Sequence, residues 1–351
     1  MIDELLRRSA TFAAFRMPGR EAMAFIQADE HLRPPHAGQR CFVLAPFDGT
    51  DGPVACIRPD EELRLDPDSL SPSSGTEVNG PSSAPVSGLD RAGYAHAVEL
   101  ALQHIRNGEL EKLVLARTID ADLSGLSVGA LFGAAARALP EAFIALANTQ
   151  RFGLWLGASP ERLLTVRKKQ VEVDALAGTM ANDLASAAAS AWGIKEREEQ
   201  AIVTRMIMAE LKDAGVEELV ASDAIVKRAG PVAHLHTRVT GHLNETSALD
   251  LAKALHPTPA VGGSPTHAAI DLIRELEPRS RSLYAGYWGP MHADSADLFV
   301  NIRCMEIHGH QALLHVGAGI TRDSVAESEC DEVERKARTW LDLIDAQRAA
   351  G

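Results

Sequence analysis

The sequence of 351 residues predicts a mixed α+β fold in which large antiparallel sheets dominate. Strand-like segments follow one another in consecutive blocks with hairpin-like spacing. In the middle of the chain these segments are residues 142–149, 152–157, 163–167 and 170–176. Strict alternation of strand and helix, the pattern of a doubly wound parallel sheet, does not occur. No glycine-rich nucleotide-binding motif follows a strand, so a nucleotide cofactor is not expected.

The first part of the chain is predicted to hold a short helix and then strands at residues 41–47 and 54–58. Residues 71–85 are rich in Ser, Pro and Gly, which indicates a surface loop or a disordered connector. A helix is expected after Asp90, which fits the N-cap position, and Gly108 fits its C-terminal stop. The apolar positions of this helix are Tyr94, Ala97, Ala101 and Ile105.

The remaining elements alternate less regularly. A strand is predicted at residues 112–118 and a helix through residues 131–139. Apolar residues at intervals of three and four predict long helices at residues 196–213 and 328–345. The last third is predicted to contain a helix at residues 268–276 and strands at residues 284–288, 298–304 and 312–316.

Charge and composition narrow the kind of protein. The formal net charge of -13 argues against a nucleic-acid partner, because phosphate binding needs a basic surface. A small anionic substrate remains open, since a local pocket can be positive on an acidic protein. The four cysteines are scattered without CxxC spacing, which predicts reduced thiols and no zinc site. The sequence shows neither a signal peptide nor an apolar run of membrane-spanning length, so we expect a soluble cytoplasmic enzyme.

The closing helix carries a first candidate site. Glu329, Glu332 and Lys336 are spaced i, i+3 and i+7, which places them on one side of the helix. One interpretation is a solvated helix face with a favourable ion pair. The other is a metal-and-anion site at the edge of the core, because the three residues border the apolar stripe. That stripe consists of Val333, Ala337, Trp340, Leu341 and Ile344.

Glu199, on the helix predicted at residues 196–213, is a second candidate. It lies in line with the apolar face, at i, i+4 from Val203 and i, i+7 from Met206. A carboxylate directed at a core has to be paired, protonated or bound to a cation. Alternatively, a glutamate near a helix start favours the helix dipole. Two glutamates from separate helices, with water and substrate oxygens, would suit magnesium.

Three glycine-rich turns are candidates for contact with an anion. Gly178-Thr179 follows a strand, Gly262-Gly263 precedes a helix, and residues 315–321 carry two glycines after another strand. Glycines let backbone N–H groups approach an anion, but tight turns also need glycine for steric reasons. The residues by themselves therefore predict an α+β protein with a candidate site for a metal-bound anion.

Ordered segments between residues 90 and 345 resemble the chorismate-utilising enzymes, which include anthranilate, aminodeoxychorismate, salicylate and isochorismate synthases. The segments are KLVLAR, GASPERLL, DALAGT, KEREEQAIV, HLHTRVTG, LHPTPAVGGSP, YAGYWG, FVNIRC, HVGAGIT and SECDEVERKA. The resemblance implies a four-layer α/β/β/α sandwich with a deep site between the sheets. It also implies a variable N-terminal part, residues 1–89, packed on the same fold as a chorismate-binding catalytic part, residues 90–351.

The resemblance assigns roles to individual residues. Glu199 and Glu332 match magnesium-ligating glutamates, and Glu329 matches a carboxylate that reaches the metal through water, so Mg2+ is the implied cofactor. The groups expected to bind the enolpyruvyl carboxylate are Arg303, Lys336 and the backbone of Gly317, Ala318 and Gly319. The residues expected to line the ring of the substrate are Gly178, Thr179, His234 and Ala260.

Several positions separate the branches of this family. Lys112 matches the base that activates water in isochorismate and salicylate synthases, and Glu161 matches the general acid. Ala177 stands where aminodeoxychorismate synthase has a nucleophilic lysine. Ala260 stands where pyruvate-eliminating enzymes usually have threonine, and Thr266 where anthranilate synthase commonly has lysine. These residues resemble the isochorismate synthase branch.

The implied reaction adds water at one ring carbon of chorismate while the allylic hydroxyl leaves from another, which needs a base and an acid. A lysine acts as a base only when neutral, a state that burial or nearby positive charge favours. The alternative interpretation of Lys112 is an exposed lysine at a strand start. Glu161 has to stay protonated, which burial favours; the alternative is a turn residue paired with Arg162.

Three other functions stay open at this point. Salicylate synthase, which also eliminates pyruvate, is the nearest, followed by an ammonia-using synthase and a non-catalytic chorismate-binding relative. The expected partner is chorismate alone, with no glutaminase subunit and a monomeric state. The product would feed menaquinone, siderophore or salicylate synthesis, and the residues do not choose among these pathways.

Overall fold

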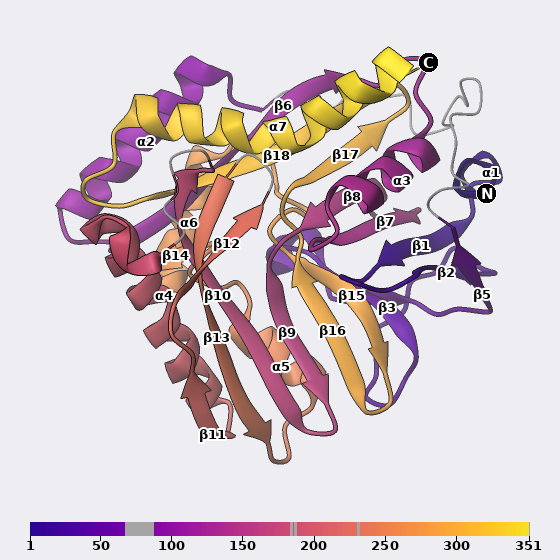
Figure 1. The fold of residues 1–351 in the computed structure, drawn as a ribbon, viewed down its shortest axis with the longest axis horizontal. Helices are drawn as coiled ribbons and strands as arrows, with labels where there is room; N and C mark the ends of the chain where they lie inside the picture. The colour runs from indigo at the N-terminus through magenta and orange to yellow at the C-terminus, as the bar shows by residue number, and fades with distance from the viewer. Residues whose placement is uncertain (67–87, 183–184, 186–187, 230–231, 351) are drawn as a thin grey trace.

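The computed structural model describes residues 1–66, 88–182, 185, 188–229 and 232–350. The loop or connector predicted at residues 71–85 lies outside these ranges. Two large sheets form the centre of the molecule, and every strand pairing between their named strands is antiparallel. This arrangement confirms the predicted α+β class with large antiparallel sheets (Figure 1).

The strands of the first sheet come from both ends of the chain. In spatial order they are β14 (Gly263–Ser264), β6 (Lys112–Asp122), β18 (Gln311–Ile320), β17 (Cys304–His308), β8 (Gly153–Ser159), β7 (Phe143–Thr149), β1 (Thr11–Arg16), β2 (Ala22–Gln27) and β5 (Glu61–Leu65). Residues before position 67 thus form one end of a sheet whose other strands come from later in the chain. The division of the chain at residue 89 stays a prediction.

The second sheet is built in the same way. Its order is β11 (Val216–Ala221), β13 (Val232–Leu243), β10 (Gln170–Ala181), β9 (Arg162–Arg167), β16 (Ser295–Val300), β15 (Tyr287–His292), β3 (Cys41–Ala45) and β4 (Ala55–Ile57). A further strand, β12 (Ile225–Ala229), pairs with β13 beside this path. The long, paired strands β10 and β13 both carry residues of the candidate site.

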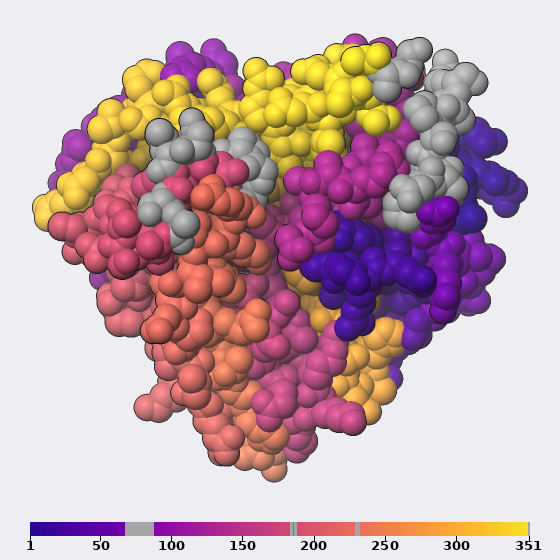
Figure 2. All heavy atoms as spheres, viewed as in Figure 1, coloured from indigo at the N-terminus to yellow at the C-terminus, as the bar shows by residue number. Residues whose placement is uncertain are grey.

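Helices cover the outer face of each sheet, which gives the four predicted layers (Figure 1). The first sheet packs against α2 (Arg91–Arg106), α3 (Val128–Ala138) and α7 (Ala326–Ala350), and the second against α4 (Ile194–Asp213) and α5 (Ala248–Leu255). In the space-filling view α7, in yellow, extends along one end of the molecule (Figure 2). The shorter helices are α1 (Ile2–Arg7), against α3, and α6 (Thr266–Leu276), against β6 and β14. Among the described residues, no helix is long and apolar enough to cross a membrane.

Local sequence explains where α2 begins and which face it buries. The side chain of Asp90 accepts a hydrogen bond of 2.7 Å from the backbone N–H of Gly93, which satisfies one of the free donors of the first turn. The predicted apolar face is buried in full, at Tyr94, Ala97, Ala101 and Ile105. The helix prediction from Asp90 is therefore confirmed.

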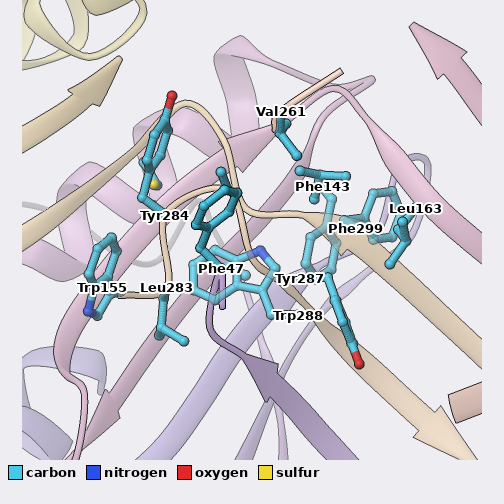
Figure 3. Packing of buried hydrophobic residues seen from close by; sticks show 14 of the residues in the cluster. Phe47, Phe143, Trp155, Leu163, Val261, Leu283, Tyr284, Tyr287, Trp288 and Phe299 are labelled. Carbon is cyan, nitrogen blue, oxygen red and sulfur yellow. The ribbon is translucent and has the colours of Figure 1, made fainter. Parts of the chain in front are cut away.

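Aromatic side chains fill the space between the sheets (Figure 3). Phe143 on β7 stacks on Phe299 of β16, with ring centroids 4.3 Å apart, so a ring from each sheet meets its counterpart directly. Gly157 on β8 lies directly against the ring of Trp288 of β15. A Cβ at Gly157 would be 2.7 Å from the Trp288 ring, closer than real Cβ contacts, so glycine permits this packing.

Three sequence predictions are wrong in this region. A single strand over residues 298–304 does not form, because the chain leaves the second sheet after Val300 and enters the first at Cys304. Arg303, at the crossing, has a φ of 51°, which no regular strand accommodates. The strand predicted from Tyr284 begins at Tyr287. The glycine turn predicted at residues 315–321 is also absent, since β18 continues to Ile320.

We predict that Arg281→Met destabilises the fold by about 3–5 kcal/mol, because it leaves Glu277 as a buried charge without its partner. Arg281 donates hydrogen bonds of 2.9 Å to Glu277, 2.7 Å to the Val114 carbonyl and 2.8 Å to the Val261 carbonyl. The free energy of unfolding in urea measures this loss. The control is Arg338→Met, at an exposed pair with Asp342, which should change stability by less than about 0.5 kcal/mol. Equal effects of the two substitutions would contradict the prediction.

Candidate active site

One cavity gathers almost all of the predicted site residues from both sheets and from α4 and α7. Of the predicted set, only Gly178 and Ala318 do not line it. The predicted residues that do are Lys112, Glu161, Thr179, Glu199, His234, Ala260, Arg303, Gly317, Gly319, Glu329, Glu332 and Lys336. Residues far apart in the sequence thus meet in one place, which makes this cavity the candidate active site.

Three carboxylates of the cavity each face a lysine. Glu199 Oε1 lies 2.7 Å from Lys112 Nζ, and Glu332 Oε1 lies 2.7 Å from Lys336 Nζ. Glu329 Oε1 lies 3.9 Å from the ammonium of Lys195. Buried charges have to be paired, and these contacts satisfy that requirement.

Lys195 is a residue of the cavity that the sequence patterns do not single out. Its position four residues before Glu199, on the same helix, is the spacing that places two side chains on one face. That spacing is the signal that could have found it. Tyr284, which also lines the cavity, falls within a strand predicted from the sequence and lies instead in a turn.

Helix α4 is fixed to the sheet at the residue next to Glu199. The Gln200 side chain accepts a hydrogen bond of 2.8 Å from the Ala177 N–H and donates one of 2.9 Å to the Ala175 carbonyl. Both bonds go to the backbone of β10, so the turn of α4 that carries Glu199 is held against that strand. The buried face of α4 consists of Gln200, Val203, Ile207 and Leu211.

The environment of Glu199 favours its charged form. Burial opposes ionisation, but Lys112 and then Lys336 and Lys195 outweigh it, so the pKa of Glu199 lies below its ordinary value. The pKa of Glu329 is shifted the other way, raised by burial and by the neighbouring Glu332. The sequence predicts that Glu329 and Glu332 lie beside the apolar stripe of α7. The burial of Val333 and Ala337, which belong to that stripe, agrees with this prediction.

Glycine leaves room for the charged groups on the floor of the cavity. A Cβ at Gly319 would lie 3.0 Å from Lys112 Cε and 3.2 Å from Glu199 Oε1, so any larger residue would crowd the ion pair. Lys336 donates a hydrogen bond of 2.8 Å to the carbonyl of Gly317. Gly178 acts differently: its φ of +64° forms a bulge between Ala177 and Thr179 where β10 meets β13.

Glu161 occupies the short turn between β8 and β9 and is 4% exposed. Its backbone N–H donates to Ser159 Oγ at 3.2 Å, and its carbonyl accepts from the N–H of Val300 at 3.1 Å. Burial, followed by the nearby Asp174, raises the pKa of Glu161 to about 8. The side chain is therefore mostly protonated at neutral pH, as a general acid requires.

His234 and Arg303 form a polar part of the cavity wall. His234 Nδ1 lies 3.1 Å from Thr179 Oγ1, and its Nε2 lies 3.4 Å from Arg303 Nη2. Burial, and then Arg303, lowers the pKa of His234 well below its ordinary value, so the ring is neutral. Burial lowers the pKa of Arg303 to about 10, which leaves the guanidinium charged at neutral pH. A neutral imidazole beside a buried cation suits the binding of an anion.

The acidic residues fit magnesium by their chemistry. Magnesium prefers oxygen ligands and usually takes one or two protein carboxylates together with water and substrate oxygens. Glu199 and Glu332 face the same cavity from two helices and offer such donors. In the part of the chain that the structure describes, no three acidic, histidine or cysteine side chains are already gathered around one point.

The fold and this cavity define a class of protein. Residues 63–345 match the chorismate binding enzyme family, so the chain belongs to it. The Escherichia coli protein "Isochorismate synthase MenF" is 33% identical over 267 residues, which cover 72% of this chain and 61% of that protein. The crystal structure of E. coli MenF, described as the menaquinone-specific isochorismate synthase, superposes with a TM-score of 0.79 at 26% identity, covering 95% of this chain and 88% of that chain.

Other relatives show how far the similarity extends. "Isochorismate synthase MenF" of Bacillus subtilis is 30% identical over 269 residues, covering 74% of this chain and 57% of that protein. "Anthranilate synthase component 1" of Methanothermobacter thermautotrophicus is 31% identical over 268 residues, covering 73% of this chain and 57% of that protein. The matched part thus spans about three fifths of the length of these curated relatives, and identity alone does not separate the two activities.

We predict that Glu161→Gln stabilises the protein increasingly as the pH rises from 5 to 8. The folded protein holds this proton up to a pKa of about 8, whereas the unfolded chain releases it near 4.5. Wild-type stability therefore falls across this window by up to about 1.4 kcal/mol per pH unit, and the glutamine variant lacks the loss. Urea unfolding of both proteins at several pH values measures the difference. Glu141→Gln, at an exposed site, is the control; a pH-independent difference at Glu161 would contradict the prediction.

Proposed function

We propose that this protein is an isochorismate synthase that converts chorismate to isochorismate. The observation that carries the proposal is that Lys112 and Glu161, both buried, line the same cavity as the cationic groups. Water forms a new C–O bond at one ring carbon, and the allylic hydroxyl leaves from another as water. The protonated carboxyl of Glu161 supplies the proton to the departing hydroxyl, and the attacking water gives one to Lys112, so atoms balance.

Lys112 has a specific requirement in this proposal. Lys112 Nζ donates a hydrogen bond of 2.7 Å to Glu199 Oε1. To act as the base, Lys112 has to give up both this contact and its own proton.

In this proposal, each of the two carboxylates of chorismate binds to groups of opposite charge. Arg303 and Lys336 are the proposed partners of the enolpyruvyl carboxylate, with Gly317 at the edge of the same wall. Magnesium, held by Glu199 and Glu332 with Glu329 beside them, would neutralise the ring carboxylate and fix the substrate. Thr179, His234 and Ala260 would then border the ring. Fixing the dianion in one orientation supplies much of the rate enhancement in such a reaction.

We further propose that the protein works in the cytoplasm as a monomer and needs no glutaminase subunit. The substitutions Ala177 and Ala260 support water over ammonia and isomerisation over pyruvate elimination. The pathway that uses the product, menaquinone, siderophore or salicylate synthesis, is not decided by these residues.

Incubation of the purified protein with chorismate and magnesium tests the function. Chromatography should reveal isochorismate, and an isochorismate-consuming coupling enzyme should draw the reaction forward. Release of pyruvate without the coupling enzyme would indicate a salicylate synthase, and an ammonium-dependent aromatic amine would indicate an ammonia-using enzyme. Binding of chorismate by calorimetry without any product would indicate a non-catalytic relative.

We predict that Lys112→Gln and Glu161→Gln each lower isochorismate formation by about 100-fold or more, because each removes one proton-transfer group. Steady-state rates at pH 7 measure the loss, and circular dichroism verifies the fold. Lys253→Gln, at an exposed lysine of α5 outside the cavity, is the matched control and should retain full activity. Near-normal turnover in Lys112→Gln or Glu161→Gln would contradict the assignment of these residues as base and acid.

We predict that Glu199→Ala and Glu332→Ala abolish magnesium-dependent turnover, since each removes a proposed ligand. Calorimetric titration with magnesium alone should also show weaker binding, a readout that does not depend on activity. Glu334→Ala, at a partly exposed residue of α7 paired with Arg91, is the control and should bind magnesium as the wild type does. An unchanged titration in both ligand variants would count against the site.

A further inference from the structure

A second group of charges lies behind Glu161, outside the cavity lining. Lys227, on β12, donates a hydrogen bond of 2.7 Å to the carbonyl of Pro160, the residue directly before Glu161. The same ammonium lies 3.6 Å from Asp174 Oδ2 on β10. One lysine therefore connects the turn that carries the proposed general acid to a carboxylate on a neighbouring strand.

Asp174 is held in place from more than one side. His236 Nε2 lies 2.9 Å from Asp174 Oδ1, and both side chains are buried. Burial opposes ionisation of Asp174, but His236, Lys227 and Arg162 outweigh it and lower its pKa to about 2. Asp174 is thus a permanently negative group inside the protein, close to a carboxyl group that has to remain neutral.

The register of the strands explains this proximity. Glu172 on β10 is opposite Thr165 on β9, and continuing this register by two residues brings Asp174 opposite Leu163, two residues after Glu161. Alternation along β10 places Asp174 on the same face as Leu176, which lines the cavity. Asp174 itself is not among the residues that line the cavity.

Charged groups of both signs act on Glu161. Lys227, Lys112 and Lys336 favour its ionised form, whereas Asp174 opposes it after burial itself. Three cations facing one buried carboxyl would by themselves draw its proton away. Burial, and after it the fixed anion of Asp174 beside Lys227, counteract these cations, and the effect of the charge is large because the interior screens charges poorly.

We propose that Asp174 and Lys227 are positioning residues for Glu161: the lysine fixes the turn that presents the acid, and the aspartate keeps its proton in place. This inference rests on the proposed function, because it explains why Glu161 can donate a proton at neutral pH. Asp174 begins the DALAGT segment, but the sequence assigns no role to it or to Lys227, and neither residue lines the cavity. The pair sets the upper pH limit of the reaction.

The test compares pH profiles of kcat/KM, which report on groups of the free enzyme. Turnover by a general acid falls as the pH rises through its pKa. In Asp174→Asn the loss of the negative charge should move this alkaline limb down by about one pH unit, so that activity at pH 8 falls roughly fivefold more than at pH 6. Lys227→Met removes a positive charge and should move the limb up. The conservative variants Asp174→Glu and Lys227→Arg should restore the wild-type limb.

A direct titration separates this inference from the proposed function. Carboxyl 13C NMR of ligand-free protein, with Glu161→Gln used for assignment, should show a lower midpoint for Glu161 in Asp174→Asn and a higher one in Lys227→Met. Asp297→Asn, at a carboxylate of β16 paired with Arg167, is the control and should leave the midpoint unchanged. Wild-type inactivity toward chorismate would overturn the proposed function alone.

Two outcomes would overturn the inference. One is an unmoved midpoint and alkaline limb in both variants, and the other is movement of both variants in the same direction, as a general loss of structure would give. If Asp174→Asn does not fold, Lys227→Met decides by itself, since only the electrostatic role predicts an upward shift there.

Discussion

Pairing of buried charges is the constraint on which this structure depends. Between two apolar sheets an isolated ammonium or carboxylate would cost several kcal/mol, yet the cavity is lined by lysines 112, 195 and 336 and by five glutamates. The structure meets this constraint with lysine–glutamate contacts, two of them at 2.7 Å. Each contact joins separate elements or successive turns of one helix, so α4, α7 and β6 are fixed relative to one another. The groups that must later bind a charged ligand are thus already oriented.

The same cavity contains one carboxyl group whose surroundings favour its neutral form over its charged form. Glu161 has no lysine within ion-pairing distance among the described contacts, and its turn is fixed through the backbone, by Ser159, Val300 and Lys227. Burial and the anion of Asp174 keep it protonated. Two carboxyl groups with separate environments can take separate roles, one as a ligand or partner of a cation and one as an acid. This difference in environment, more than the identity of the residues, is what the fold contributes to the chemistry.

Much of the fold is predictable from local patterns, and the wrong predictions have a common cause. The helix from Asp90 and the strand pairs β7–β8 and β9–β10 follow from capping and from hairpin-like spacing, which depend on neighbouring residues. The strand predicted at residues 298–304 does not form because the chain changes sheets at Arg303, and no local pattern encodes that change. The glycines at 317 and 319 indicate a turn by their local pattern, but they lie within β18, where Gly319 makes room for Lys112 and Glu199. When a residue makes room for side chains that are distant in the sequence, its role cannot be predicted from its own segment.

The sequence by itself determined the α+β class, the family resemblance and the residue types of the site, because periodicity, capping and ordered motifs are all properties of the linear chain. Helical spacing alone places Glu329, Glu332 and Lys336 on one side of α7. Only the tertiary structure decided which charges meet: that Lys112 contacts Glu199, that Lys195 faces Glu329, and that Asp174 and Lys227 stand behind Glu161. The physical reason is that electrostatic energies depend on distance and burial, which long-range strand order sets and sequence separation does not.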